Sequence, residues 1–315
     1  LDRKSTAHSE SKAIYGQATW TPASMDALHL TVGGRYTWDD KDGKLEVVNN
    51  AATNLTFSSK VDRFDPLVTL AYDVSNNINV YGKYSTGYRA GGASSRSLTY
   101  RSFDPEEVKA YEIGLKSDLF DRRVRFNAAV YAMDRTDSQI DFSLVTVQGA
   151  STRNTLETIN APGTTKIRGL ELEGQFRAND YLTLSASYAY TDAKVPDTVN
   201  PFNGQVQQVF IAYTPENSGS VAADWNSPFM GATFKAHVDA NYADATQSTL
   251  GDLISPNLTI DPNAYGAGRG VRITRGSVTT TSGIGTSRTP GGAWREGTSN
   301  PYNLRIDIAP FAGGT

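Results

Sequence analysis

The sequence of 315 residues predicts an all-β protein, namely a transmembrane antiparallel up-and-down β-barrel. Three observations support this fold class. Apolar residues recur with a period of two, short and long connections alternate along the chain, and aromatic residues lie near the predicted strand ends. Helical spacing is nearly absent, and no apolar run reaches the roughly 18 residues of a transmembrane helix.

Alternating side chains define each predicted strand. Within residues 28–38, Leu30 and Val32 occupy one face, while Thr31 and Arg35 occupy the other. Most of the predicted strands approach the roughly 9–11 residues that a tilted strand needs to cross a bilayer. The pattern predicts eleven strands, at residues 12–21, 28–38, 64–74, 78–89, 109–119, 123–135, 167–178, 181–191, 218–225, 232–243 and 302–309.

The connections between these strands alternate in length. Short turns rich in Asn, Asp, Pro and Gly are predicted at residues 22–26, 75–77, 120–122, 178–180 and 226–231. Long loops are predicted at residues 39–63, 90–108, 136–166, 192–217 and 244–301. Loops above about 12–15 residues are uncommon in compact soluble domains. Transmembrane barrels, in contrast, combine short periplasmic turns with long extracellular loops.

Aromatic and charged residues separate this fold from a soluble β-sandwich, which also alternates but rarely has long connections on one side only. Within the strand interiors, charged side chains are expected opposite the apolar row, with Arg168, at a strand end, as the exception. A charge facing lipid at the bilayer midplane would cost roughly 2–4 kcal/mol. Eight aromatic residues are expected near strand ends on the apolar face: Trp20, Trp38, Tyr72, Tyr88, Tyr190, Trp225, Tyr242 and Tyr302.

Composition excludes several classes of function. The chain has no cysteine, which excludes disulfide scaffolds, zinc ribbons and cysteine nucleophiles. Its net charge of −3 argues against a nucleic-acid partner held by bulk charge. The three histidines have no metal-binding spacing, and no pocket argument supports acid–base catalysis by Glu171 and Glu173, so we expect no enzyme, metal site or cofactor.

Residues 81–142 carry a set of motifs in a characteristic order. Tyr81-Gly-Lys-Tyr-Ser-Thr-Gly-Tyr-Arg-Ala-Gly-Gly92 is followed by Phe103-Asp-Pro-Glu-Glu-Val108, by Tyr111-Glu-Ile-Gly-Leu-Lys-Ser117 and by Asp137-Ser-Gln139. Each motif is weak alone, but their order and spacing resemble the barrel of TonB-dependent outer-membrane receptors. Further similar segments are residues 30–36, 124–131 and 169–174.

This resemblance implies a larger protein than the present chain. Members of the family have about 22 strands, so residues 1–315 are expected to form a partial barrel, with the plug domain and the closing C-terminal strands absent. The resemblance also implies import of a scarce, bulky solute across the bacterial outer membrane, with energy delivered through TonB, which acts on the plug. The expected partners are outer-membrane lipid, the TonB complex and a solute such as an iron chelate, cobalamin, a nickel complex or a glycan.

Two groups of candidate binding residues follow. Eleven polar residues are expected on the inner face, where they would contact the plug, line a solute path or simply face water: Arg35, Lys83, Arg89, Glu112, Lys116, Arg125, Glu171, Glu173, Lys235, His237 and Asp239. The second group lies in the segment 269–295, which lacks acidic residues and could hold an anionic ferric siderophore or lipopolysaccharide phosphates, or form a solvated loop. It consists of Arg269, Arg272, Arg275, Arg288 and Arg295.

Alternation and loop lengths alone leave other functions open. A passive porin would share the polar-lined wall but would have no plug. A passenger translocator and a soluble β-rich binding protein are further alternatives.

Overall fold

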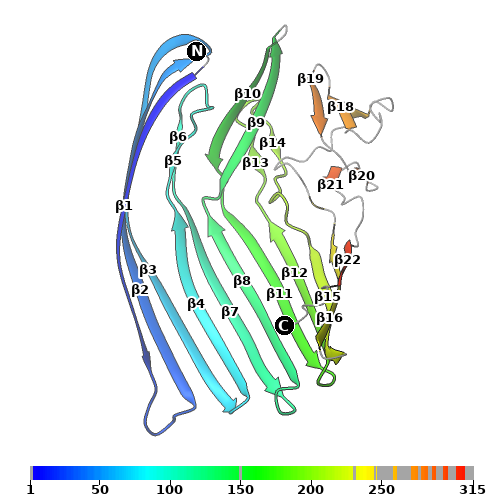
Figure 1. Cartoon of the computed structure of the whole chain (residues 1–315). Coiled ribbons are helices and arrows are strands. Elements are labelled where there is room, and N and C mark those ends of the chain that lie inside the picture. The colour runs from blue at the N-terminus through cyan, green and yellow to red at the C-terminus, as the bar shows by residue number, and fades with distance from the viewer. Residues whose placement is uncertain are drawn as a thin grey trace.

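The computed structural model describes residues 3–148, 151–229, 232–244 and 246, together with short strands within residues 258–308. Eleven strands form one antiparallel sheet, which we call the wall (Figure 1). Each strand of the wall pairs with the wall strand that follows it along the chain. They are β1 (Arg3–Trp20), β2 (Leu28–Val48), β3 (Ala51–Ser75), β4 (Ile78–Arg89), β7 (Glu106–Leu119), β8 (Val124–Thr136), β11 (Thr164–Arg177), β12 (Leu182–Lys194), β15 (Asn217–Phe229), β16 (Ala232–Ala243) and β22 (Asn303–Ile308).

Each of the eleven predicted strands overlaps one of these, and the all-β fold class is confirmed. The first strand starts earlier than predicted, at Arg3 rather than at residue 12, and its added residues pair with the extension of β2. No described segment is an apolar helix of membrane-spanning length. Figure 1 shows a tall, curved sheet with its short turns at one end and its long connections at the other.

The strands are staggered in the way that a tilted barrel wall requires. Tyr72 of β3 pairs with a residue of β4, that residue pairs with one of β7, and the same row of register partners continues strand by strand to Tyr242 of β16. The row begins near the turn end of β3 and ends near the loop end of β16. Each step perpendicular to the strands therefore moves toward the loop end. Strand tilt and register stagger are coupled in closed sheets, so this drift indicates a segment of a barrel rather than a flat sheet.

Residues 39–63 correct the predicted loop. β2 and β3 continue through this segment as a paired hairpin, closed by Asn49 and Asn50, whose φ angles are 51° and 65°. Two consecutive residues with positive φ are typical of the tight turn that matches strand twist, and asparagine tolerates this conformation. The segment carries charges on both faces, which is appropriate for strands that project beyond the bilayer into water.

The other long connections also contain paired strands rather than continuous loops. These are β5 (Gly92–Ala93) with β6 (Ser102–Phe103), β9 (Gln139–Gln148) with β10 (Ser151–Asn160), and β13 (Thr198–Val199) with β14 (Val206–Gln207). Beyond residue 244 the described strands are β17 (Leu258–Ile260), β18 (Val271–Arg275), β19 (Val278–Ser282), β20 (Thr286–Arg288) and β21 (Trp294–Glu296).

The connections share a small hydrophobic core. Ile140 and Phe142 of β9 pack with Ala161 and with Val209, which lies after β14. Connections that follow β8 and β12 are therefore held together by apolar contacts. The wall itself buries little, since Val68 is 37% exposed and Val130 49% exposed on its apolar face. Such a surface requires lipid as its solvent.

The apolar face forms a band of bilayer height. In β2 it extends over residues 28–38, about 34 Å along the strand at roughly 3.4 Å per residue, or about 24 Å along the membrane normal at a tilt near 45°. Trp20 and Trp225 lie near the turn end of the band, and Tyr190 and Tyr242 lie near its loop end. Aromatic residues at both edges are typical of the two membrane interfaces. Tyr302 lies outside the described residues.

Two predictions about this face need correction. Arg168 is not the only charge on it, because the register also places Lys12, Lys109 and Asp134 there, all toward the loop ends of their strands. Tyr88 does not reach a lipid interface. Its hydroxyl instead donates a hydrogen bond to the Asp39 carboxylate of β2.

The position of Tyr88 follows from a separation of two wall strands. Pairing between β3 and β4 stops at Leu67 and Ser85, although both strands continue toward the loops. Polar contacts bridge the gap beyond this point. Asp65 accepts hydrogen bonds from Arg63 at 2.8 Å and from Thr86 at 2.9 Å. The side chains of Arg63 and Asp65 are only 16% and 10% exposed, so this pair is a buried structural link.

Candidate functional site

The polar face of the sheet carries all eleven predicted inner-face residues. Alternation and strand register place each of them opposite the apolar band, and they are distributed from β2 to β16. The structure therefore gathers them on one surface, but it brings only some of them into contact.

The centre of the polar face is a cluster on β4 and β7. Tyr81 donates a hydrogen bond of 2.6 Å to Oε1 of Glu112, and Lys83 lies directly opposite Glu112 in the register. The ammonium group of Lys116 lies 5.5 Å from the centre of the Tyr81 ring, within the range of a cation–π interaction. Tyr81 thus contacts one acidic and one basic candidate at the same time.

Beside this cluster, β11 contributes two carboxylates. Glu173 accepts a hydrogen bond of 3.1 Å from Asn127, whereas Glu171 makes no hydrogen bond or ion pair within the described part of the chain. Glu171 lines a hollow of about 700 Å³ together with Tyr81 and Lys116. An acidic side chain without a partner, next to a hollow, is suited to receive a cationic group from whatever occupies the lumen.

The remaining candidates lie apart from this centre. All of them except Lys235 have hydrogen-bond or ion-pair partners within the described part of the chain, and none lines the hollow. Arg35 donates to Thr37 at 3.0 Å, Arg89 pairs with Glu106 at 3.1 Å, Arg125 pairs with Asp118 at 2.8 Å, His237 contacts Asp224 at 2.6 Å and Asp239 at 3.4 Å, and Lys235 lies opposite Asn226.

The arginine group of segment 269–295 lies outside the residues whose side chains the structure describes. Arg269 lies outside the described residues, whereas Arg272 and Arg275 belong to β18, Arg288 to β20 and Arg295 to β21. The anion-binding hypothesis for this group therefore stays a prediction.

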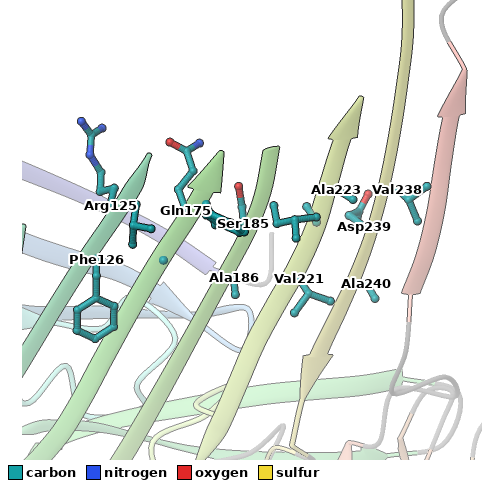
Figure 2. A pocket seen from close by; sticks show the side chains of 15 residues that line it. Arg125, Phe126, Gln175, Ser185, Ala186, Val221, Ala223, Val238, Asp239 and Ala240 are labelled. Atoms are coloured by element: carbon teal, nitrogen blue, oxygen red, sulfur yellow. The ribbon is translucent and has the colours of Figure 1, made fainter. Parts of the chain in front are cut away.

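A second hollow, of about 570 Å³, lies on the opposite face of the wall between β8 and β16. Figure 2 shows Phe126, Ala186 and Val221 on one side of the sheet, with Arg125 and Gln175 on the other. Small residues such as Gly174 and Ala186 create this depression in the apolar band. Because this hollow faces hydrocarbon, it does not belong to a path for a polar solute.

Sequence reasoning missed the role of Gln139, although its motif was recognised. The Gln139 side-chain amide donates to the carbonyls of Arg89, Ala90 and Asp104 at 3.3, 3.2 and 3.0 Å. Its backbone N–H donates to Glu106 at 2.8 Å. One side chain from the start of β9 therefore fixes both ends of the connection between β4 and β7.

Replacing Gln139 by leucine is expected to loosen this connection. The carbonyls of Arg89 and Ala90 lose the side-chain donor, whereas the Asp104 carbonyl keeps a hydrogen bond of 2.9 Å from Asn160. A net loss of about 2 kcal/mol corresponds to roughly 30-fold more frequent local opening. Limited proteolysis of the full-length protein should therefore cut residues 90–104 much faster. The matched variant is Gln205→Leu, in the exposed connection between β13 and β14. Equal cleavage rates in the two variants would contradict this role of Gln139.

Comparison with known proteins identifies the family of this chain. The family model described as "TonB dependent receptor-like, beta-barrel" matches residues 1–293. The chain belongs to the TonB-dependent receptors. The resemblance seen in residues 81–142 is confirmed, and membership of this family places the wall in a bacterial outer membrane.

Curated relatives of this TonB-dependent receptor chain are transporters and receptors. It is 25% identical over 230 residues to the ferric-pyoverdine M114 receptor PbuA of Pseudomonas sp. strain M114, covering 72% of this chain and 26% of that protein. It is 24% identical over 245 residues to the ferrichrome outer membrane transporter/phage receptor of Escherichia coli K12, covering 75% of this chain and 29% of that protein. The chain thus spans well under half the length of these relatives.

Solved structures show the same fold. The ferric yersiniabactin uptake receptor FyuA of Yersinia pestis matches with a TM-score of 0.63 at 15% identity, over 96% of this chain and 45% of that one. The siderophore receptor PiuA of Acinetobacter baumannii matches with a TM-score of 0.60 at 16% identity, over 88% of this chain and 42% of that one.

Proposed function

We propose that the full-length protein imports a ferric siderophore across the outer membrane, with energy delivered through TonB. Residues 1–315 would form part of the barrel wall around a plug contributed by the rest of the protein. The observation that carries this proposal is the continuous polar inner face, with the unpartnered carboxylate of Glu171 beside a hollow. The relatives are receptors or transporters of ferric-pyoverdine and ferrichrome, which supports an iron chelate as the solute class.

Transport by this receptor is expected to require energy. Cells that lack the gene should lose uptake of radiolabelled iron from at least one ferric siderophore, and the full-length gene should restore it. A protonophore should abolish the restored uptake, because the plug can be displaced only by work from the inner membrane. Uptake that persists at full rate in the presence of the protonophore would instead indicate a passive porin.

The solute class is tested in the same cells. A panel of ferric hydroxamates, catecholates and mixed chelates, with cobalamin and a maltooligosaccharide as non-iron solutes, should show saturable uptake of an iron chelate only. Saturable uptake of cobalamin or glycan, with none of iron, would overturn the iron assignment while leaving energised import intact.

A further inference from the structure

Charged residues border the apolar band on four neighbouring strands of the wall. On β7, β8, β11 and β12, the next outward-facing residue beyond the band toward the loops is Lys109, Asp134, Arg168 and Asp192, respectively. Since the band marks the hydrocarbon of the bilayer, these side chains lie at the height of the outer-leaflet headgroups.

Within this border, cations outnumber carboxylates around Asp134. Arg168 forms an ion pair of 2.7 Å with Asp134 and also donates to the carbonyl of Met133 at 2.7 Å. Lys109 and Lys166 lie directly opposite Asp134 in the register, one on each neighbouring strand. Both lysines are exposed, and neither forms an ion pair within the described part of the chain. The single carboxylate is therefore engaged by arginine, and two positive charges remain unmatched.

The neighbouring charges do not offset this excess. Lys194 and Asp192 form a separate pair at 2.7 Å on β12. Glu107, further along β7, is held by Arg63 of the β3–β4 link. The positive patch of Lys109, Lys166 and Arg168 is thus local to β7, β8 and β11.

The corresponding face of β1 to β3 has the opposite balance. There, Lys12 pairs with Glu10 at 2.6 Å, and Lys60 pairs with Asp40 at 2.7 Å. The register adds further acidic residues to the same face, so that carboxylates exceed lysines: Glu10, Asp40, Asp42 and Asp62 against Lys12, Lys44 and Lys60. An anion in the outer leaflet would be repelled from this sector.

We propose that Lys109, Lys166 and Arg168 bind the phosphate groups of lipid A, the phosphorylated glycolipid anchor of lipopolysaccharide, at the outer side of the wall. Arg168 is fixed by its carbonyl and carboxylate partners, so its position is preorganised, and the two free ammonium groups supply the unmatched charge. The patch continues the lipid-facing wall, which places its ligand in the membrane rather than in the lumen. The proposal depends on the location of the wall and is independent of solute import.

The test uses the full-length receptor, purified in detergent and immobilised. Its probes are lipid A with two phosphates, the same lipid after enzymatic removal of both phosphates, and inorganic phosphate. The double variant Lys109→Ser/Lys166→Ser is expected to bind the phosphorylated lipid about 25-fold more weakly, since each cation near an anionic headgroup contributes roughly fivefold. Both proteins should bind the dephosphorylated lipid equally, and inorganic phosphate should not compete.

The matched control is Lys12→Ser/Lys60→Ser, which removes two lysines from the same face in the acidic sector and should leave lipid affinity unchanged. Unchanged affinity in Lys109→Ser/Lys166→Ser would overturn the proposal, as would an equal loss in the control. Competition by inorganic phosphate would overturn it in favour of a free-anion site. If the double variant does not fold, Lys166→Gln alone is expected to weaken binding about fivefold. Iron uptake should persist in all folded variants.

Discussion

Replacing Gly169 by valine is expected to cause a large loss of folded receptor. Gly169 lies on the polar face of β11, and a Cβ atom added there would be 2.3 Å from the ring of Tyr131 and 2.6 Å from the carbonyl oxygen of Tyr190. The ring covers the glycine and is fixed by a 3.0 Å hydrogen bond to Thr191. Tyr131 could move, but the carbonyl belongs to the backbone of β12 and cannot shift without disturbing the strand pairing. Overpacking of this kind costs about 1–3 kcal/mol for a small side chain, and valine should reach or exceed the upper value.

The same strand supplies a control for this prediction. A Cβ atom at Gly174 would meet nothing within 4 Å, and this residue faces the apolar side of the wall. Gly174→Val should therefore fold as the wild type does. The measurement is the fraction of full-length receptor that keeps the mobility of a folded barrel on unheated gels, followed by urea titration. Equal urea midpoints for the two variants would contradict the close approach at Gly169.

Replacing Glu171 by lysine is expected to reduce energised uptake by roughly 10- to 100-fold while the barrel remains folded. The carboxylate makes no hydrogen bond or ion pair within the described chain and lines the inner hollow, so a reversed charge would repel the cationic group that we propose it receives. Hydrogen bonds to charged groups contribute about 1.5–3 kcal/mol, which sets this range. Glu171→Gln should show a smaller loss, because the amide keeps the shape and one acceptor.

Kinetics of uptake distinguish the two possible contacts of Glu171. A plug contact should lower the maximal rate for every siderophore that the receptor takes up, whereas a solute contact should raise the apparent KM for one of them. The matched variant is Asp180→Lys, the same charge reversal in the exposed turn between β11 and β12, where the side chain is 86% exposed. Normal uptake by folded Glu171→Lys protein would show that this carboxylate only faces water.

The wall of this receptor could be predicted from sequence because lipid imposes a simple rule on it. Every second residue of a membrane strand must be apolar, so segments such as residues 64–74 and 181–191 stand out without any knowledge of their partners. Residues 39–63 did not stand out, because strands in water can carry charges on both faces. Their only local signal was the pair Asn49 and Asn50, which permits a tight turn.

Contacts within the site were less predictable than the face on which its residues lie. Alternation is enough to place Glu112 and Glu171 on the polar side. It does not reveal that Tyr81 joins Glu112 to Lys116, since this depends on the register between β4 and β7. Likewise, the carbonyls that Gln139 holds come from a connection about 35–50 residues earlier in the chain. Such long-range partners leave no periodic pattern in the sequence.

The height of the β2–β3 hairpin determines what approaching particles meet first. Residues 39–49 extend about 35 Å along the strand beyond the apolar band, and Figure 1 shows this hairpin and β9–β10 as the tallest parts of the labelled wall. Large particles arriving from the medium would reach these two projections before the shorter β5–β6 connection. Changes in Asn49 and its neighbours therefore alter the outermost surface of the described chain without touching the inner face.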